Sequence, residues 1–136
     1  MIDTSDPPRV LCVDDNPDVA DSIAVLLEIS GYEARACYNG ASALAKAEIF
    51  APDICLIDLN MPGMDGDVLA IHLREAGRPL LLAAVTAMSS EESCLRIAAA
   101  GFDLHLVKPV DPRRLLAAIG TLWQARPRAR GTEDED

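Results

Sequence analysis

The chain has 136 residues and a mass of 14.5 kDa, which suffices for one domain and leaves little room for a second. Half of its residues are hydrophobic, a quarter are charged and 4% are aromatic, so the composition excludes a disordered, collagen-like or low-complexity protein. The net charge of -10 opposes binding to nucleic acid or to an anionic membrane, and we expect neither as a partner.

Five short hydrophobic runs predict five β-strands. They lie at residues 9–13, 33–37, 54–58, 80–86 and 104–107. Four of them are almost continuous in Val, Leu, Ile, Cys or Ala, which is typical of strands that helices cover on both faces of a parallel sheet. The run at 33–37 alternates between polar and hydrophobic residues, which favours an edge strand. Helical patterns separate the runs, so the sequence predicts an α/β domain with right-handed crossovers.

Start and stop signals delimit the first two helices. Asn16 followed by Pro17 is the combination of an N-cap and a first helical residue, and Gly31 ends the pattern. Asn39 opens the second helix, which we expect to run through Ile49. Each of these helices therefore begins shortly after a predicted strand.

The third and fourth helices differ in hydrophobic content. The third is expected over residues 66–76. Ser89 and Glu92 form a capping-box pattern for the fourth, over residues 90–100. This helix has few large hydrophobic residues, so we expect it to be held weakly and to shift at low energetic cost.

The last helix and the tail complete the chain. The pair at 111–112, Asp-Pro, opens a fifth helix. This helix turns three hydrophobic residues inward: Leu115, Ile119 and Leu122. The composition becomes polar after position 123, so the sequence predicts a folded domain over residues 9–123 and a disordered tail over residues 124–136.

The sequence contains no signal for export. The longest uninterrupted hydrophobic run, residues 80–85, is far too short to cross a membrane, and residues 1–8 lack the pattern of a signal peptide. We therefore expect a cytoplasmic protein. The cysteines show no C-x-x-C spacing and no neighbouring histidine, which favours buried, reduced thiols over a zinc site. They are Cys12, Cys37, Cys55 and Cys94.

Four of the predicted strands end in charged or hydroxyl residues. These are Asp14 and Asp15 after the first strand, Asp58 in the third, Thr86 in the fourth and Lys108 after the fifth. In an open parallel sheet the ligand site lies beyond the carboxyl ends of the strands, so we expect these residues at one rim. Carboxylates about 5 Å apart repel by roughly 3 kcal/mol per pair at an effective dielectric constant of about 20, so this group requires a cation.

The composition of the rim favours Mg²⁺. It offers oxygen ligands without His or Cys, which selects a hard cation, and its few carboxylates leave coordination positions for water. A phosphoryl group can complete such a shell. Phosphoryl transfer needs an in-line nucleophile and positive charge near the transferring oxygens, and Asp58, the metal ion, Lys108 and Thr86 could supply these parts.

Four motifs, in this order, point to one known family. They are Val13-Asp14-Asp15-Asn16, the stretch DLNMPGMDG at 58–66, Thr86-Ala87 and Lys108-Pro109. Over residues 9–123 the chain resembles the receiver domain of two-component response regulators, the CheY-like family. The resemblance implies a flavodoxin-like (βα)5 doubly wound parallel sheet with strand order 2-1-3-4-5.

The resemblance also implies a role for each site residue. Asp58 would accept phosphate from a histidine kinase or a His-containing phosphotransfer protein. Asp15, Asp58 and the Asn60 carbonyl would hold Mg²⁺, with Asp14 acting mainly through water. Lys108 would pair with the phosphoryl group. Such a protein catalyses only its own phosphorylation and dephosphorylation.

A readout of phosphorylation is implied as well. Thr86 would hydrogen-bond the phosphoryl group and rearrange the face made by the fourth helix, fifth strand and fifth helix, which a downstream effector protein recognises. The family's usual Tyr or Phe switch is replaced by His105, which leaves two alternatives: a modified switch, or a partly exposed, satisfied histidine without that role. The bond before Pro109 is expected to be cis. The apolar Met88 predicts a long phosphoryl lifetime.

Other interpretations stay open. A haloacid-dehalogenase-type Mg²⁺ phosphatase also uses an Asp nucleophile, although it requires an Asp-x-Asp pattern after the first strand and usually a cap domain. A flavodoxin-like electron carrier shares the fold class but requires a hydroxyl-rich loop where this chain has Asp14 and Asp15. The chain ends soon after the fifth helix, so we expect no output domain, and both a stand-alone receiver and a piece of a hybrid kinase fit the sequence.

Overall fold

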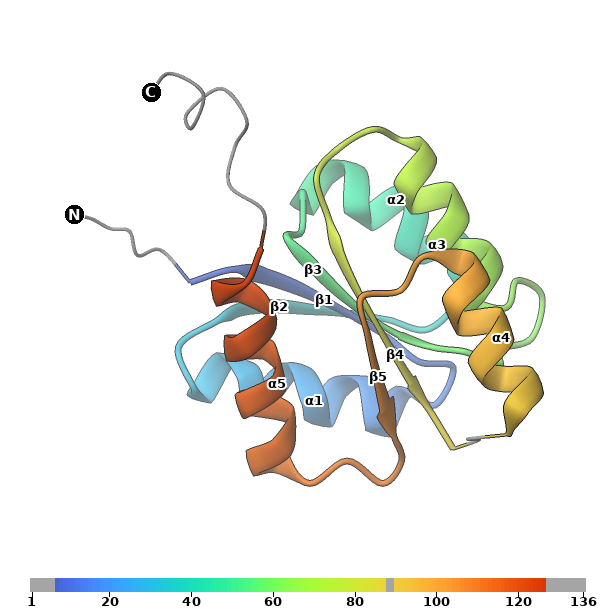
Figure 1. Ribbon diagram of the computed structural model, residues 1–136. Helices are drawn as coiled ribbons and strands as arrows, with labels where there is room; N and C mark the ends of the chain where they lie inside the picture. The colour runs from blue at the N-terminus through green and yellow to red at the C-terminus, as the bar shows by residue number, and fades with distance from the viewer. Residues whose placement is uncertain (1–6, 88–89, 127–136) are drawn as a thin grey trace, which may run out of the picture.

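The computed structural model describes residues 7–87 and 90–126. Strands and helices alternate along the chain (Figure 1). The strands are β1 (Arg9–Val13), β2 (Glu33–Cys37), β3 (Ile54–Asp58), β4 (Leu81–Thr86) and β5 (Leu104–Val107). The helices are α1 (Pro17–Ile29), α2 (Gly40–Phe50), α3 (Gly66–Glu75), α4 (Glu91–Ala100) and α5 (Pro112–Gln124). Within the described part of the chain, none of these helices has the length and hydrophobicity to cross a bilayer.

All five strands form one parallel sheet in the order β2-β1-β3-β4-β5, which confirms the predicted architecture. β2 lies at one edge, as its alternating pattern predicts, and β5 at the other. Ile57 pairs with Val13, and Asp58 pairs with Val85. This register aligns the carboxyl ends of β1, β3 and β4, so residues far apart in the sequence meet at one edge of the sheet.

Helices cover both faces of the sheet. α2, α3 and α4 lie on one face, and α1 and α5 on the other (Figure 1). Alternate residues of β1 enter the two layers: Leu11 and Val13 pack in the core with α2 and α3, and Val10 and Cys12 with α1 and α5. Full burial of one such aliphatic side chain stabilises the fold by about 1.5–3 kcal/mol, so this alternation fixes which face each helix covers.

α4 and α5 differ in how they are anchored. In α5, Leu115 and Ile119 are buried as predicted, and Leu122 is half-buried. α4 contributes less hydrophobic surface: its Ile97 packs against Leu59 and against β4. This difference agrees with the prediction that the fourth helix is held weakly.

Three details correct the sequence predictions. The N-cap of α4 is Ser90, whereas the predicted cap, Ser89, lies outside the described residues; because the two serines are adjacent, composition cannot choose between them. Cys94 is exposed, because it lies on the solvent side of α4, whereas the other three cysteines are buried and free. Gln124 belongs to α5, one residue into the predicted tail. Residues 127–136 lie outside the described residues.

Candidate functional site

Three carboxylates meet at the carboxyl edge of the sheet. Asp14 and Asp15 follow β1 and Asp58 ends β3, and one oxygen of each lies within 4.8 Å of the others. Asp14 and Asp58 are only 4% and 6% exposed, whereas Asp15 is exposed. The Asp14 backbone N–H donates to the Cys37 carbonyl at 3.1 Å, and its Oδ1 accepts the Asn16 N–H at 2.9 Å. The turn after β1 therefore fixes one carboxylate of the cluster.

Lys108 brings a positive charge to this cluster. It follows β5, its backbone N–H donates to the Thr86 carbonyl at 2.9 Å, and its bond to Pro109 is cis. Its Nζ lies 2.7 Å from Asp14 Oδ2 and 3.5 Å from Asp58 Oδ2. Burial alone would lower the pKa of Lys108, but the hydrogen bond to Asp14 and the charges of both carboxylates outweigh it and raise that pKa. The ammonium therefore stays charged.

The negative charge around Asp58 exceeds what Lys108 balances. Burial raises the pKa of Asp58 and the charge of Asp14 raises it further, while Lys108 opposes both. The result is a pKa of about 6, compared with an ordinary value of 3.8. A second cation would stabilise the ionised form. Because the carboxylates and nearby carbonyls are all hard oxygen donors, the residues present fit Mg²⁺.

The loop between β3 and α3 packs closely on the backbone of Asp58. The Gly66 N–H donates to the Leu59 carbonyl at 2.8 Å, and a Cβ at Gly66 would lie 2.2 Å from the Asp58 carbonyl oxygen. Glycine is the residue that permits this approach. Asn60 lies on the same loop and is exposed, and Thr86 is fully buried at the end of the neighbouring β4. The structure thus places both predicted residues beside the strand that carries Asp58.

His105 lies in the middle of β5, where it pairs in register with Ala84 and is half-buried. Its Nε2 is buried and has no hydrogen-bond partner within the described residues. The expectation of a satisfied histidine is therefore wrong for this nitrogen among the described residues, and a modified switch role for His105 stays a prediction. Met88 lies outside the described residues, so the expected long phosphoryl lifetime stays a prediction.

One residue of this region was not predicted from the sequence. Arg96 of α4 reaches the β3–α3 loop, where its Nη1 donates to Asn60 Oδ1 at 3.2 Å. Its Nε and Nη2 donate to the two carboxylate oxygens of Asp67 at 3.0 and 2.9 Å. These contacts join residues 36 and 29 positions apart, which no local pattern reveals. The one available signal is that Arg96 is the only basic residue of segment 91–100.

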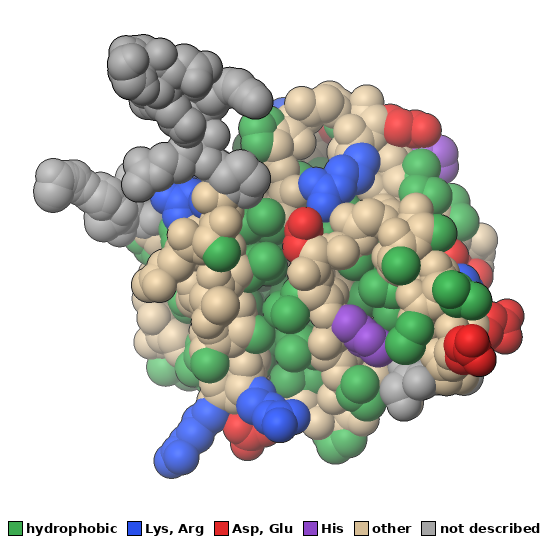
Figure 2. Space-filling model, viewed as in Figure 1, with side chains coloured by type: hydrophobic (Ala, Val, Ile, Leu, Met, Phe, Trp, Pro, Cys, Tyr) green, Lys and Arg blue, Asp and Glu red, His purple; other side chains and the backbone are tan. Residues whose placement is uncertain are grey.

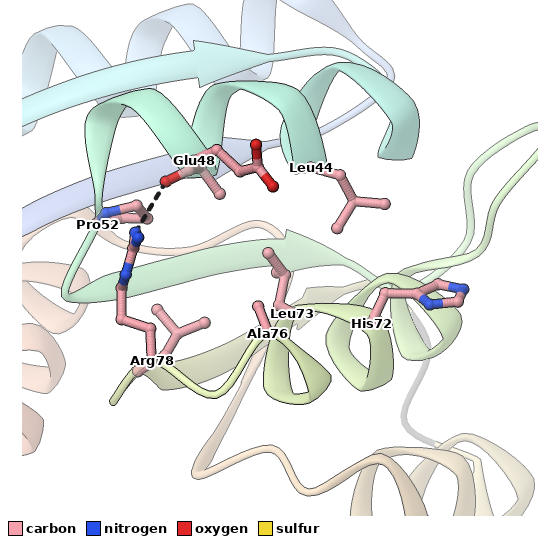
Figure 3. Close-up of a pocket in the computed structure, with 9 residues that line it drawn as sticks. Leu44, Glu48, Pro52, His72, Leu73, Ala76 and Arg78 are labelled. Carbon is pink, nitrogen blue, oxygen red and sulfur yellow. Dashed lines mark hydrogen bonds between the residues drawn. The ribbon is translucent and has the colours of Figure 1, made fainter.

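A separate groove lies between α2 and α3 (Figure 3). Its volume is about 600 Å³, and Arg78 Nη1 donates to the Ala47 carbonyl at 3.2 Å beside it. Two of its lining residues lie just before strands: Pro52 is two residues before β3, and Leu80 is directly before β4. The groove therefore lies at the amino edge of the sheet, and none of the predicted site residues lines it.

Known proteins resemble this chain over nearly all of its described strands and helices. The response regulator receiver domain family matches residues 10–120. The chain is 36% identical over 119 residues to the transcriptional regulatory protein PrrA of Mycobacterium leprae (strain TN), which covers 88% of this chain and 51% of PrrA. It is 36% identical over 121 residues to the sensor histidine kinase GacS of Pseudomonas protegens, which covers 85% of this chain and 13% of GacS. The chain thus spans about half the length of PrrA and a smaller share of GacS.

Solved structures give the same result. The chemotaxis protein CheY4 of Vibrio cholerae superposes with a TM-score of 0.82 at 30% identity, covering 85% of this chain and 98% of CheY4. A CheY-like receiver domain protein of Methanospirillum hungatei JF-1 gives 0.80 at 32% identity, covering 87% and 95%. The alternative of a haloacid-dehalogenase-type phosphatase is not supported, because the family match runs from β1 into α5. By fold, motifs and these matches, the chain belongs to the response regulator receiver domain family of two-component signalling.

Proposed function

We propose that this receiver accepts a phosphoryl group on Asp58 from the phosphohistidine of a histidine kinase or a His-containing phosphotransfer protein. A carboxylate oxygen of Asp58 attacks phosphorus, a P–O bond forms, and the P–N bond breaks with its electron pair remaining on the donor imidazole. The observation that carries this proposal is the convergence of three carboxylates and the Lys108 ammonium around one buried oxygen nucleophile.

The cofactor in this proposal is Mg²⁺, which neutralises charge on the transferring oxygens when it is bound. Asp15, Asp58 and the backbone carbonyl of Asn60 would hold it, and Asp14 would act mainly through water. The turn after β1 already fixes Asp14 through the Asn16 N–H. The close packing of Gly66 on the Asp58 carbonyl holds the other side of the site.

Lys108 and Thr86 respond to the new phosphoryl group. Lys108 Nζ lies 3.5 Å from Asp58 Oδ2, so a small movement brings it to a phosphoryl oxygen. The Thr86 hydroxyl donates to another phosphoryl oxygen and draws the loop after β4 inward. A local change of charge at Asp58 is thereby converted into a movement beside α4.

The output surface in this proposal is the face formed by α4, β5 and α5. Figure 2 shows hydrophobic side chains gathered over β5 and on the sides of α4 and α5 that face it. Leu95 of α4 and Val107 of β5 are 65% and 46% exposed. His105 lies in the same strand, where rotation of its ring would change this surface. A downstream effector protein recognises the rearranged face, and the signalling takes place in the cytoplasm.

The test is to supply Mg²⁺ and a small acyl phosphate, then to measure the intact mass and map the modified peptide. We expect one phosphate on Asp58 and none in Asp58→Asn. Asp53→Asn is the matched control, because Asp53 lies at the opposite end of β3, where it accepts the Arg9 N–H. A phosphate that persists in Asp58→Asn, or sustained turnover of phosphoesters, contradicts the proposal.

A further inference from the structure

Arg96 connects α4 to the loop that carries Asn60. Its guanidinium forms a two-pronged pair with Asp67, at 2.9 and 3.0 Å, and lies 3.5 Å from Asp65 Oδ2. From this position Nη1 also donates to Asn60 Oδ1 at 3.2 Å. The Asp67 pair raises the pKa of Arg96 and lowers that of Asp67, so both groups remain charged. One side chain of the helix thus holds both ends of the β3–α3 loop.

This contact matters for α4 because the helix has little hydrophobic anchorage. α4 lies beside α3 on one face of the sheet (Figure 1). Its buried residues are one isoleucine and two small residues: Ile97, Ser93 and Ala100. Ile97 packs against Leu59, so the hydrophobic contact and the Arg96 contact reach the same loop. A weakly packed helix can move at low cost, and a directional, planar ion pair then has a large influence on its position.

The same loop begins immediately after Asp58. Leu59 and Asn60 follow it directly, and the Met61 N–H donates to Asp65 Oδ1 at 3.2 Å, which closes the loop on itself. Arg96 therefore acts on a short, internally bonded segment whose first residue neighbours the nucleophile. Any displacement of α4 must either move this segment or break the contact to Asn60.

We propose that Arg96 is a positioning residue that holds α4 and the Asn60 loop in the unphosphorylated arrangement and so restrains the reactivity of Asp58. The inference rests on the proposed function, because it assumes that phosphorylation of Asp58 displaces α4. Coupling between two sites is reciprocal. If phosphorylation loosens the contact of Arg96 with Asn60, loss of that contact favours phosphorylation at equilibrium. We expect the rate to follow, because the contact would no longer have to loosen on the way to the phosphorylated arrangement.

The experiment measures the initial rate of Asp58 phosphorylation by a small acyl phosphate at saturating Mg²⁺. Arg96→Ala is expected to be faster than wild type by about fivefold, because the barrier no longer includes loss of the charge-assisted hydrogen bond from Arg96 to Asn60. Arg96→Lys keeps the charge but loses the planar fork, so it should resemble Arg96→Ala. In an Asn60→Ala background most of the effect of Arg96→Ala should disappear, since the two residues act through one contact.

Arg74→Ala is the matched control. Arg74 ties α3 to the C-cap of α4 and to Asp103 before β5, through hydrogen bonds to the Gly101 carbonyl at 2.8 Å and to Asp103 Oδ2 at 2.9 Å. It therefore also restrains α4, but at the end of the helix away from the Asn60 loop. Arg74→Ala should lower the melting temperature without accelerating phosphorylation. Equal acceleration by Arg74→Ala, or rates for both Arg96 variants at or below the wild-type rate, overturns the inference. Absence of phosphate on wild-type Asp58 would instead refute the proposed function.

Discussion

Asp58→Asn is expected to raise the free energy of unfolding of the metal-free protein by about 2 kcal/mol at about pH 7.5. In the folded chain this carboxylate is buried beside Asp14, and its pKa rises to about 6. Ionisation at neutral pH therefore costs stability, and the neutral amide of nearly the same shape removes that cost. The nucleophile is in this respect a destabilising residue that function retains.

The effect of Asp58→Asn must also depend on pH. Between about pH 4 and pH 6 the folded chain binds a proton at Asp58 that the unfolded chain has released, because its pKa is higher in the folded state. The stability of wild type relative to the variant therefore falls as the pH rises through this window. Below about pH 4 Asp58 is protonated in both the folded and the unfolded chain, so the difference in stability between wild type and Asp58→Asn disappears.

Urea unfolding in the presence of a chelator measures this difference at both ends of the window. Asp53→Asn is again the control. Asp53 lies at the other end of β3 and accepts the Arg9 N–H, so its replacement should not raise the free energy of unfolding. Addition of Mg²⁺ should stabilise wild type more than Asp58→Asn and shrink the gap. Equal stabilities of wild type and Asp58→Asn at about pH 7.5 without metal would show that Asp58 is not under electrostatic strain.

Lys108→Met should have the opposite effect on stability. It removes the ammonium that lies 2.7 Å from Asp14 and 3.5 Å from Asp58, and leaves both buried carboxylates facing each other. We expect a loss of about 2–3 kcal/mol in metal-free protein, somewhat below the usual cost of breaking a buried pair because Lys108 is partly exposed. Phosphorylation of Asp58 should also become much slower, because a cation near the transferring oxygens is lost.

The chain offers an unusually close control for this variant. Lys46 is the only other lysine, and it is exposed on α2. Lys46→Met changes the net charge and composition in the same way, so both its stability and its phosphorylation rate should stay near those of wild type. If both lysine variants change stability and phosphorylation rate equally, the change in net charge causes these effects. The contact of Lys108 with Asp14 and Asp58 would then not explain them.

Much of this architecture could be predicted because it depends on local patterns. Continuous hydrophobic runs give buried parallel strands, and Asn16, Asn39 and Asp111 each accept a backbone N–H at the start of a helix. The position of the site followed from one topological rule, that strands of a doubly wound sheet present their carboxyl ends at one edge. Asp14, Asp58 and their neighbours could therefore be placed together from the sequence alone.

The features that could not be predicted depend on contacts between distant segments. The reach of Arg96 from α4 to Asn60 and Asp67 depends on how two helices lie on one face of the sheet. Among the described residues, the Nε2 of His105 is buried without a hydrogen-bond partner, and no local pattern around position 105 indicates this. The exposure of Cys94 depends on which side of α4 faces the core. Composition and spacing carry no information about these arrangements.

The dependence of Asp58 phosphorylation on metal tests the central claim most directly. Wild-type protein is incubated with a small acyl phosphate over a titration of Mg²⁺, and the phosphate on the peptide containing Asp58 is quantified. The crowding of Asp14, Asp15 and Asp58 predicts a rate that rises with Mg²⁺, saturates, and falls to background when a chelator removes the metal. Phosphorylation of Asp58 at an undiminished rate in the chelator would contradict the account.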